Sequence, residues 1–384
     1  MNKVKFYLII TTVTAMVVMS VAYIFAYNKD LNSQYISDKI SIDILHDKDR
    51  TINQREDETT LYKIENIVQI QLLDVNGLNE SEIEKTKPEQ LTYKETHQGL
   101  EYYPYIFDVD KKENIYLADQ VMHKIVVFDK QGEYVKTINL KRGLDKNELP
   151  GIADIAVGTD GIYITDSKHI KKYSFDGEFK FEIDYYGSDE EFSIVDQLSI
   201  TPAGNLSFQG NGIRQIYDNV GDFISGSTGY TPYLQTTDNN FVRILPIQKG
   251  LDQIQLLDVP KGITLNSVNS SYLDKDLSQE NVDKIKNKNL INAANMSYSK
   301  NSNIDYINID NSNNIYLYES TENSFEINLI NISNKNKTKS IILSLPYSEY
   351  ENVKLDRLRV TPNGEIYFIQ KSETLLSVYK CYKQ

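Results

Sequence analysis

The chain has 384 residues, of which 40% are hydrophobic and 25% charged, with 28 Tyr, 13 Phe and no Trp. This composition provides enough apolar material for a packed core and excludes an intrinsically disordered chain. The formal net charge of −13 repels phosphate backbones, so we expect no nucleic-acid partner.

The N-terminal segment is apolar and is preceded by two positive charges. Lys3 and Lys5 lie before an uncharged run of 23 residues from Phe6 to Asn28. As a helix, such a run spans the roughly 30 Å hydrocarbon core of a bilayer. We therefore expect residues 1–5 in the cytoplasm, a single-pass anchor at 6–28, and the rest of the chain outside the cytoplasm at the cell membrane. Ser20-Val21-Ala22 also fits a signal-peptide cleavage site, so secretion after cleavage is the alternative.

Residues 29–60 are polar and mixed in charge, with few apolar side chains, so we interpret them as a stalk. Cys381 is the only cysteine, and the fold therefore contains no internal disulfide.

A short hairpin pattern recurs beyond residue 100: an apolar strand, a turn with Gly, Asn or Asp, and a strand that often opens with Ile-Tyr. Turn residues of these types accept the positive φ that a tight hairpin needs. Second hairpins follow several copies, which gives four antiparallel strands per repeat, as in a propeller blade. The copies lie at 107–119, 155–166, 198–208, 307–318 and 358–369, with a weaker one at 234–244. Six copies predict an all-β fold, a six-bladed β-propeller over residues 61–384.

Two further segments complete this prediction. The segment 61–75 alternates like a strand and precedes the first copy, so we expect it to pair in the last blade and close the propeller. The segment 273–294 has apolar residues near helical spacing and a capping pair, which predicts a short helical insertion.

The segment 114–135 resembles the NHL repeat. It keeps Ala118-Asp119, His123, Lys124-Ile125, Phe128-Asp129 and Gly132 of that pattern, with Asn114, Met122 and Lys124 as departures. The second copy keeps Thr165-Asp166 and Phe175-Asp176-Gly177, and the later copies keep only the hairpin chemistry. The resemblance implies a propeller that serves as a binding platform and sometimes as an enzyme.

An acidic residue recurs near the start of the first strand in several copies. Asp196, Asp305 and Asp356 each lie ten residues before an aligned apolar position, and Asp154 lies near the same place. Four such carboxylates could hold a divalent cation such as Ca²⁺ or a basic ligand. Alternatively, each bonds nearby backbone N–H groups and fixes its own blade. We interpret Asp108 and Asp110 as hairpin-turn residues and expect structural hydrogen bonding for Asp119 and Asp166.

No residue set forms a catalytic signature, and no cofactor is predicted. We expect a non-enzymatic, membrane-anchored binding module outside the cytoplasm, which recognises a protein, peptide or glycan at a propeller face and contacts the membrane through its N-terminal helix. The alternative is a calcium-dependent, lactonase-like or other hydrolase on a six-bladed propeller.

Overall fold

The computed structural model describes residues 62–76, 78, 82, 85–95, 101–102, 104–185, 195, 197–210, 213–228, 233–248, 251–257, 261, 263–266, 303–320, 324–331, 340–346, 358–372 and 374–383. The chain forms two compact units, Met1–Asp57 and Glu58–Gln384, and all described residues belong to the second. The predicted anchor at 6–28, stalk at 29–60 and helical insertion at 273–294 all lie outside the described residues. Within these residues, no helix is long and apolar enough to cross a membrane.

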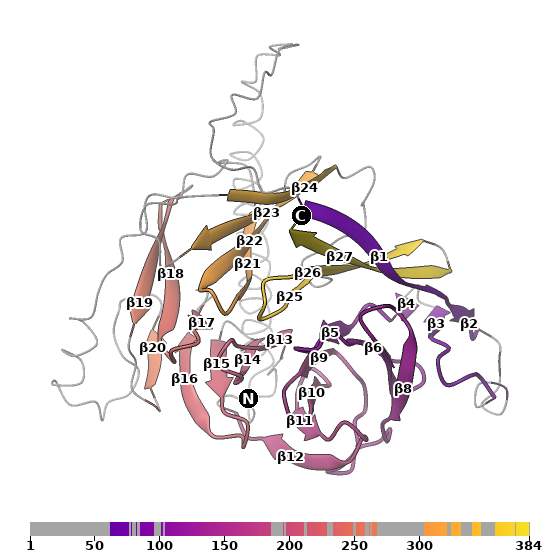
Figure 1. Ribbon diagram of the computed structural model, residues 1–384. Coiled ribbons are helices and arrows are strands. Elements are labelled where there is room, and N and C mark those ends of the chain that lie inside the picture. Colours follow the sequence, from indigo (N-terminus) through magenta and orange to yellow (C-terminus); the bar gives the residue numbers. More distant parts are fainter. Residues whose placement is uncertain are drawn as a thin grey trace, which may run out of the picture. The chain divides into compact units, whose positions relative to one another are not determined.

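All named elements are strands, and most belong to five propeller blades (Figure 1). Blade 1 contains β5 (Phe107–Val109), β6 (Ile115–Asp119), β7 (Lys124–Phe128) and β8 (Tyr134–Asn139). Blade 2 contains β9 (Asp154–Val157), β10 (Ile162–Thr165), β11 (Ile170–Tyr173) and β12 (Phe179–Ile183). Blade 3 contains β13 (Gln197–Ile200), β14 (Leu206–Gly210), β15 (Ile213–Tyr217), β16 (Phe223–Thr228) and β20 (Ile263–Asn266).

The remaining strands form two blades and two smaller sheets. Blade 4 contains β21 (Asn303–Ile309), β22 (Asn314–Ser320), β23 (Ser324–Asn331) and β24 (Ser340–Pro346). Blade 5 contains β25 (Leu358–Val360), β26 (Ile366–Ser372), β27 (Leu375–Lys383) and β1 (Tyr62–Gln71). One three-stranded sheet contains β17 (Tyr233–Gln235), β18 (Phe241–Gln248) and β19 (Leu251–Leu257), and the other contains β2 (Leu73–Asp74), β3 (Thr92–Glu95) and β4 (Glu101–Tyr102).

The all-β propeller is confirmed, but the predicted number of six blades is not. The weak copy at 234–244 forms the hairpin of β17 and β18, whose sheet has three strands among the described residues. The next described strand along the chain, β20, does not pair with β19. It pairs in parallel with β16, from Ser225↔Ile263 to Thr228↔Asn266, and gives blade 3 a fifth strand.

Closure by the N-terminal strand is confirmed. Strand β1 pairs with β27 antiparallel, from Tyr62↔Lys383 to Gln71↔Leu375, and Figure 1 shows the indigo β1 beside β27. The first and last described segments therefore share one blade, which covers an edge of β27 that would otherwise be open.

One turn geometry recurs in the hairpins, as the sequence predicts. The first turn residue accepts a backbone bond from the fourth, as from Glu113 to Asp110 at 2.9 Å. Asp110 Oδ1 also accepts the N–H groups of Lys112 and Asn114. The fourth residue has a positive φ, which Gly and Asn tolerate best. It is Glu113, Gly132, Gly177, Gly204, Gly221, Asn239, Asn313 or Gly364.

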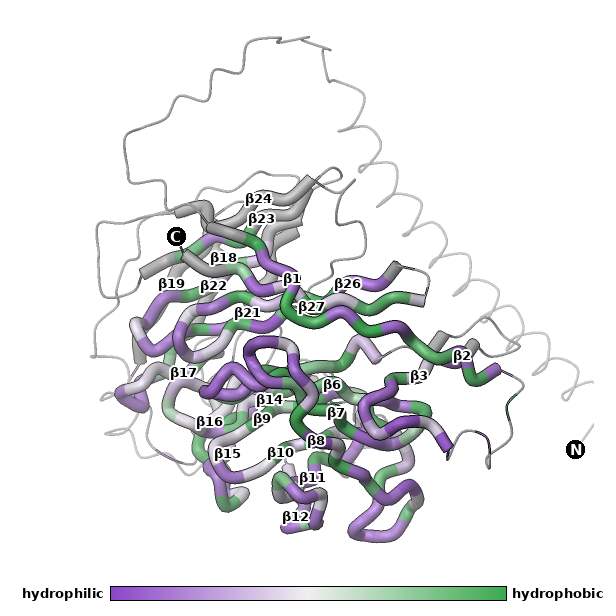
Figure 2. Tube along the Cα trace, turned by 45° about the vertical axis from the view of Figure 1, so that its right-hand side comes forward, coloured by the Kyte–Doolittle hydropathy of each residue, from purple (hydrophilic) through white to green (hydrophobic). Residues whose placement is uncertain are grey.

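The core lies within and between neighbouring sheets. Figure 2 shows hydrophobic residues along the strands, whereas the turns are mainly hydrophilic. Buried clusters join blade 1 to blades 2 and 5, blade 2 to blade 3, and blade 4 to blade 5. Tyrosines supply much of this packing: Tyr163, Tyr173, Tyr316 and Tyr367 are almost fully buried. The first strands of neighbouring blades also lie side by side, as β5 with β9 and β9 with β13, so residues on these inner strands meet.

Candidate functional site

Two carboxylates and one guanidinium form a buried group, which we call the inner-strand cluster: Asp108 on β5, Asp154 on β9 and Arg359 on β25. Arg359 Nη2 lies 2.7 Å from Asp154 Oδ1, and Arg359 Nε lies 3.9 Å from Asp108 Oδ1. The guanidinium carbon also lies 5.4 Å from the centre of the Phe107 ring. The cluster thus connects the last blade to the first two, and charge and cation–π contacts act together there.

Backbone groups bond the remaining carboxylate oxygens of the cluster. Asp154 Oδ2 accepts the N–H of Leu198 on β13 at 2.8 Å, and Asp108 Oδ2 accepts the N–H of Val157 at 2.6 Å. Burial raises the pKa of Asp108 to about 6, against the opposing effect of Arg359. Burial also raises the pKa of Asp154, again opposed by Arg359. Each carboxylate therefore fixes a neighbouring blade at a cost in desolvation.

The space beside this cluster is small. Inner-strand residues of all five blades line a cavity of about 30 Å³, among them Asp108, Ser199, Asn308 and Arg359. This volume is about that of one water molecule. The cavity is thus too small for a peptide or a sugar.

Of the four acidic residues that the sequence predicts at the site, only Asp154 has a described side chain. Asp154 lies on the first strand of its blade, as predicted, and its carboxylate binds Arg359 and a backbone N–H. For Asp305 only the backbone is described, in β21 opposite Tyr318, and Asp196 and Asp356 lie outside the described residues. Among the described residues no three His, Cys, Asp or Glu side chains are close enough to hold a metal ion. Both carboxylate oxygens of Asp154 are hydrogen-bonded within the protein, and a role for Asp154 as a cation ligand stays a prediction.

Asp108 lies within β5, so its interpretation as a turn residue is wrong. Asp110 begins the turn and accepts its N–H groups, so the same interpretation is confirmed for Asp110. Asp119 and Asp166 make the expected structural bonds: Asp119 accepts the N–H and hydroxyl of Thr92, and Asp166 accepts the N–H groups of its own turn. The sequence did hold a signal for the cluster. A polar residue stands between two apolar ones in FDV, LSI, INI and LRV, which places Asp108, Ser199, Asn308 and Arg359 on the inner strands.

A second, larger concavity lies along the outermost strand of blade 2. We call it the β12 groove; its volume is about 670 Å³. It is lined by the consecutive residues 179–185 and by Lys146, Lys168 and His169. Side chains of successive strand residues point to opposite faces of a sheet. A concavity lined by seven consecutive residues therefore follows the edge of β12 and not one face of the blade.

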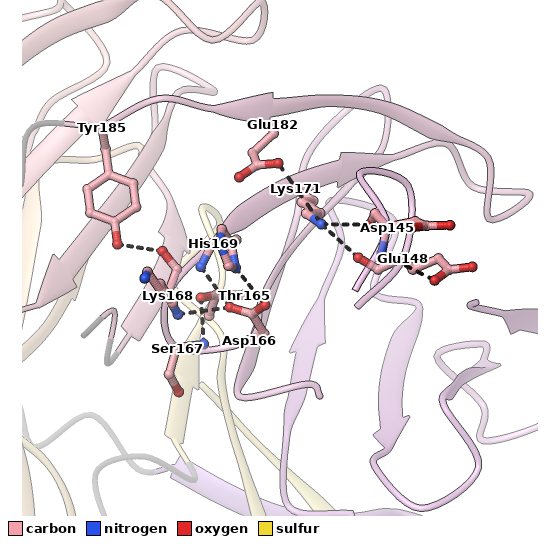
Figure 3. A network of polar contacts seen from close by, with 10 residues as sticks. All are labelled: Asp145, Glu148, Thr165, Asp166, Ser167, Lys168, His169, Lys171, Glu182 and Tyr185. Atoms are coloured by element: carbon pink, nitrogen blue, oxygen red, sulfur yellow. Dashed lines mark hydrogen bonds and ion pairs between the residues drawn. The ribbon is translucent and has the colours of Figure 1, made fainter. Parts of the chain in front are cut away.

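Buried polar contacts hold both walls of the groove (Figure 3). The buried Lys171 donates from Nζ to the carbonyl oxygens of Glu148 at 2.7 Å and Asp145 at 3.5 Å, and so fixes the loop that carries Lys146. Tyr185 donates its hydroxyl to the carbonyl of Lys168 at 2.5 Å, which ties the end of β12 to the turn between β10 and β11. The groove is therefore preorganised on both sides.

Positive charge is concentrated at the groove. Lys146, Lys168 and Lys180 line it together with Glu182 and Asp184, and Lys171 Nζ lies 4.0 Å from Glu182 Oε2. Three lysines and two carboxylates thus line the groove, in a chain whose net charge is −13. Among the described residues, the exposed Lys146 and Lys168 form no ion pair. Phe179 and Phe181 add half-buried aromatic surface.

Comparisons with known proteins give similarities of fold only. No protein-family model matches the chain, and no curated protein matches it. Among solved structures, a DUF4221 family member from Bacteroides vulgatus is 12% identical with a TM-score of 0.42, covering 85% of this chain and 100% of that one. Virginiamycin B lyase from Staphylococcus aureus is 13% identical with a TM-score of 0.38, covering 84% and 100%. PQQ-bound aldose sugar dehydrogenase from Streptomyces coelicolor is 10% identical with a TM-score of 0.40, covering 84% and 99%. The resemblance to the NHL repeat stays a prediction.

Proposed function

We propose that this protein is a membrane-anchored binding module outside the cytoplasm, and that the β12 groove binds an anionic ligand. The observation that supports this most is the excess of lysines in a preorganised concavity of an acidic protein. The exposed Lys146 and Lys168 would pair with carboxylates of a ligand. Opposite charges speed the association of a ligand and fix its orientation. The inner-strand cluster, in contrast, has its charges bonded internally.

A labelled acidic peptide tests this proposal. The probe is a fluorescein-labelled peptide of about eight residues that alternates Glu and Val, titrated against the full-length chain in detergent and followed by fluorescence anisotropy. We expect saturable binding that weakens with added salt, because exposed charges are screened. The triple variant Lys146→Gln, Lys168→Gln, Lys180→Gln should bind at least about tenfold more weakly.

The matched control neutralises exposed lysines of other turns, as Lys87→Gln, Lys112→Gln and Lys130→Gln, and should bind like the wild type. Absence of saturable binding, or equal affinity of the groove variant and the control, would overturn the proposed function.

The location is proposed from the N-terminal sequence. The uncharged run at 6–28 after Lys3 and Lys5 would hold the propeller at the outer side of the membrane. Membrane fractionation and protease treatment of intact cells test this. We expect the chain in the membrane fraction and its propeller accessible to protease; a released propeller would instead support signal cleavage.

A further inference from the structure

The edge of β12 has the properties of a site for strand addition. Strand β12 is the outermost strand of blade 2 and pairs with β11 through Ile183↔Ile170 and Phe181↔Lys172. Among the described residues no other strand pairs with it. We propose that the β12 groove takes an extended acidic peptide, which adds to this edge as a fifth strand of the blade. This inference rests on the proposed function and specifies the ligand class.

The hydrogen-bond pattern of the blade sets the direction of the free backbone groups. Asp166 N donates to the carbonyl of His169 and closes the hairpin of β10 and β11. In an antiparallel ladder the bonded and non-bonded pairs alternate, so the backbone groups of Lys172 face β12. The N–H and C=O of its partner Phe181 then face β11. The next residue, Glu182, directs its N–H and C=O away from the blade into the groove.

Blade 3 provides an internal precedent for this pairing. Its outermost hairpin strand, β16, is covered by β20, a strand from a distant part of the chain that joins in parallel over four residue pairs. The outer edge of a blade in this fold is thus able to accept an extra strand. Blade 2 has the same four-stranded arrangement with a groove in the place where its neighbour has β20.

The side chains that line the groove indicate which peptide fits. Residues of an added strand alternate between the two faces of the blade. Acidic residues would meet Lys146, Lys168 and Lys180. Apolar residues would meet Phe181, which packs toward blade 3, whereas Phe179 packs on the opposite side, toward blade 1. In this mode main-chain bonds provide affinity and alternate side chains provide specificity. A charged edge strand also protects against aggregation. The experiment must distinguish this protective role of the lysines from the binding of a peptide.

Backbone methylation of the peptide separates strand pairing from charge attraction. Two versions of the Glu-Val peptide carry N-methyl groups on alternate residues, one version on the odd positions and the other on the even positions. Both keep the charge and side chains of the parent, but a methylated nitrogen donates no hydrogen bond. If the peptide adds to β12, one version should lose at least about tenfold in affinity and the other should bind nearly like the parent.

The outcomes distinguish the two proposals. If the parent and both methylated versions bind equally, and the lysine variant still weakens them, the groove binds anions and strand addition is wrong. If the parent peptide does not bind, the proposed function fails as well. The lysines would then only protect the edge of β12 against aggregation. An isotope-edited infrared spectrum, in which a ¹³C=O label of the bound peptide gives the low-frequency band of a paired strand, checks the pairing directly.

Discussion

The inner-strand cluster and the β12 groove use charged residues in opposite ways. In the cluster, Arg359 is placed between Asp108 and Asp154, and backbone N–H groups bond the other carboxylate oxygens. In the groove, Lys146 and Lys168 are exposed, and only the walls behind them are fixed. Buried charges must be compensated within the protein, whereas exposed charges cost little and are available to a ligand. This difference supports a structural role for the first region and the proposed binding role for the second.

The largest loss of stability is expected for substitution of Arg359, at the centre of the inner-strand cluster. Arg359→Ala leaves two buried carboxylates without their cation and removes the contact with Phe107. We expect a loss of about 3–5 kcal/mol in the free energy of unfolding, measured by urea denaturation and circular dichroism at pH 7.5. Arg142→Ala, at an exposed position, is the control and should change stability little. A loss in Arg359→Ala no larger than in this control would contradict a structural role of the cluster.

A smaller loss is expected for Asp154→Ala. This change removes the acceptor of both Arg359 Nη2 and the N–H of Leu198, and leaves buried donors without a partner. We expect a loss of roughly 2–3 kcal/mol in the same urea experiment. The loss should be the same with Ca²⁺ and with a chelator. If Ca²⁺ stabilised the wild type but not the variant, Asp154 would be a calcium ligand and the comparison would fail.

The parts of the fold that depend on local chemistry were predictable. Most of these turns were marked by Gly or Asn because these residues tolerate positive φ at the fourth turn position best, as at Gly204 and Asn313, whereas Glu113 takes this position in the first turn. Strand β1 was predictable from its alternation alone. The blade count was not, because the sequence pattern of β17 and β18 says nothing of where the next strand pairs, and β20 joins β16.

The sites depend on distant residues and were predicted only in part. Asp154 was identified, but Arg359 lies 205 residues away along the chain, and no spacing rule connects the two. Asp108 was taken for a turn residue because Asp110, two positions later, begins the turn. The β12 groove was not predicted at all, because it is formed by loops that Lys171 and Tyr185 hold in place. Its lysines look like ordinary exposed residues in the sequence.

The pH dependence of stability sharpens the role of Asp108. Burial raises its pKa to about 6, above the value of about 3.9 in an unfolded chain. The folded state therefore binds more protons between these values, and stability falls as the pH rises from 4 to 6, by on the order of 2 kcal/mol. Asp108→Asn keeps an acceptor for Val157 and should reduce this slope, of which the raised pKa of Asp154 leaves a part. Urea unfolding at several pH values measures it, and an unchanged slope would place the titration elsewhere.

The smallest effect on stability is expected where the largest effect on binding is proposed. The variant Lys146→Gln, Lys168→Gln, Lys180→Gln removes exposed charges, of which Lys180 alone has a described partner, Glu178 at 3.1 Å. An exposed pair of this kind contributes little, so the free energy of unfolding should change by less than about 0.5 kcal/mol. Lys171→Met provides the contrast, because it removes the donor that fixes the loop at Glu148 and should cost about 1–3 kcal/mol. A large loss in the triple variant would show that the groove lysines stabilise the blade, and the division between the two regions would then be wrong.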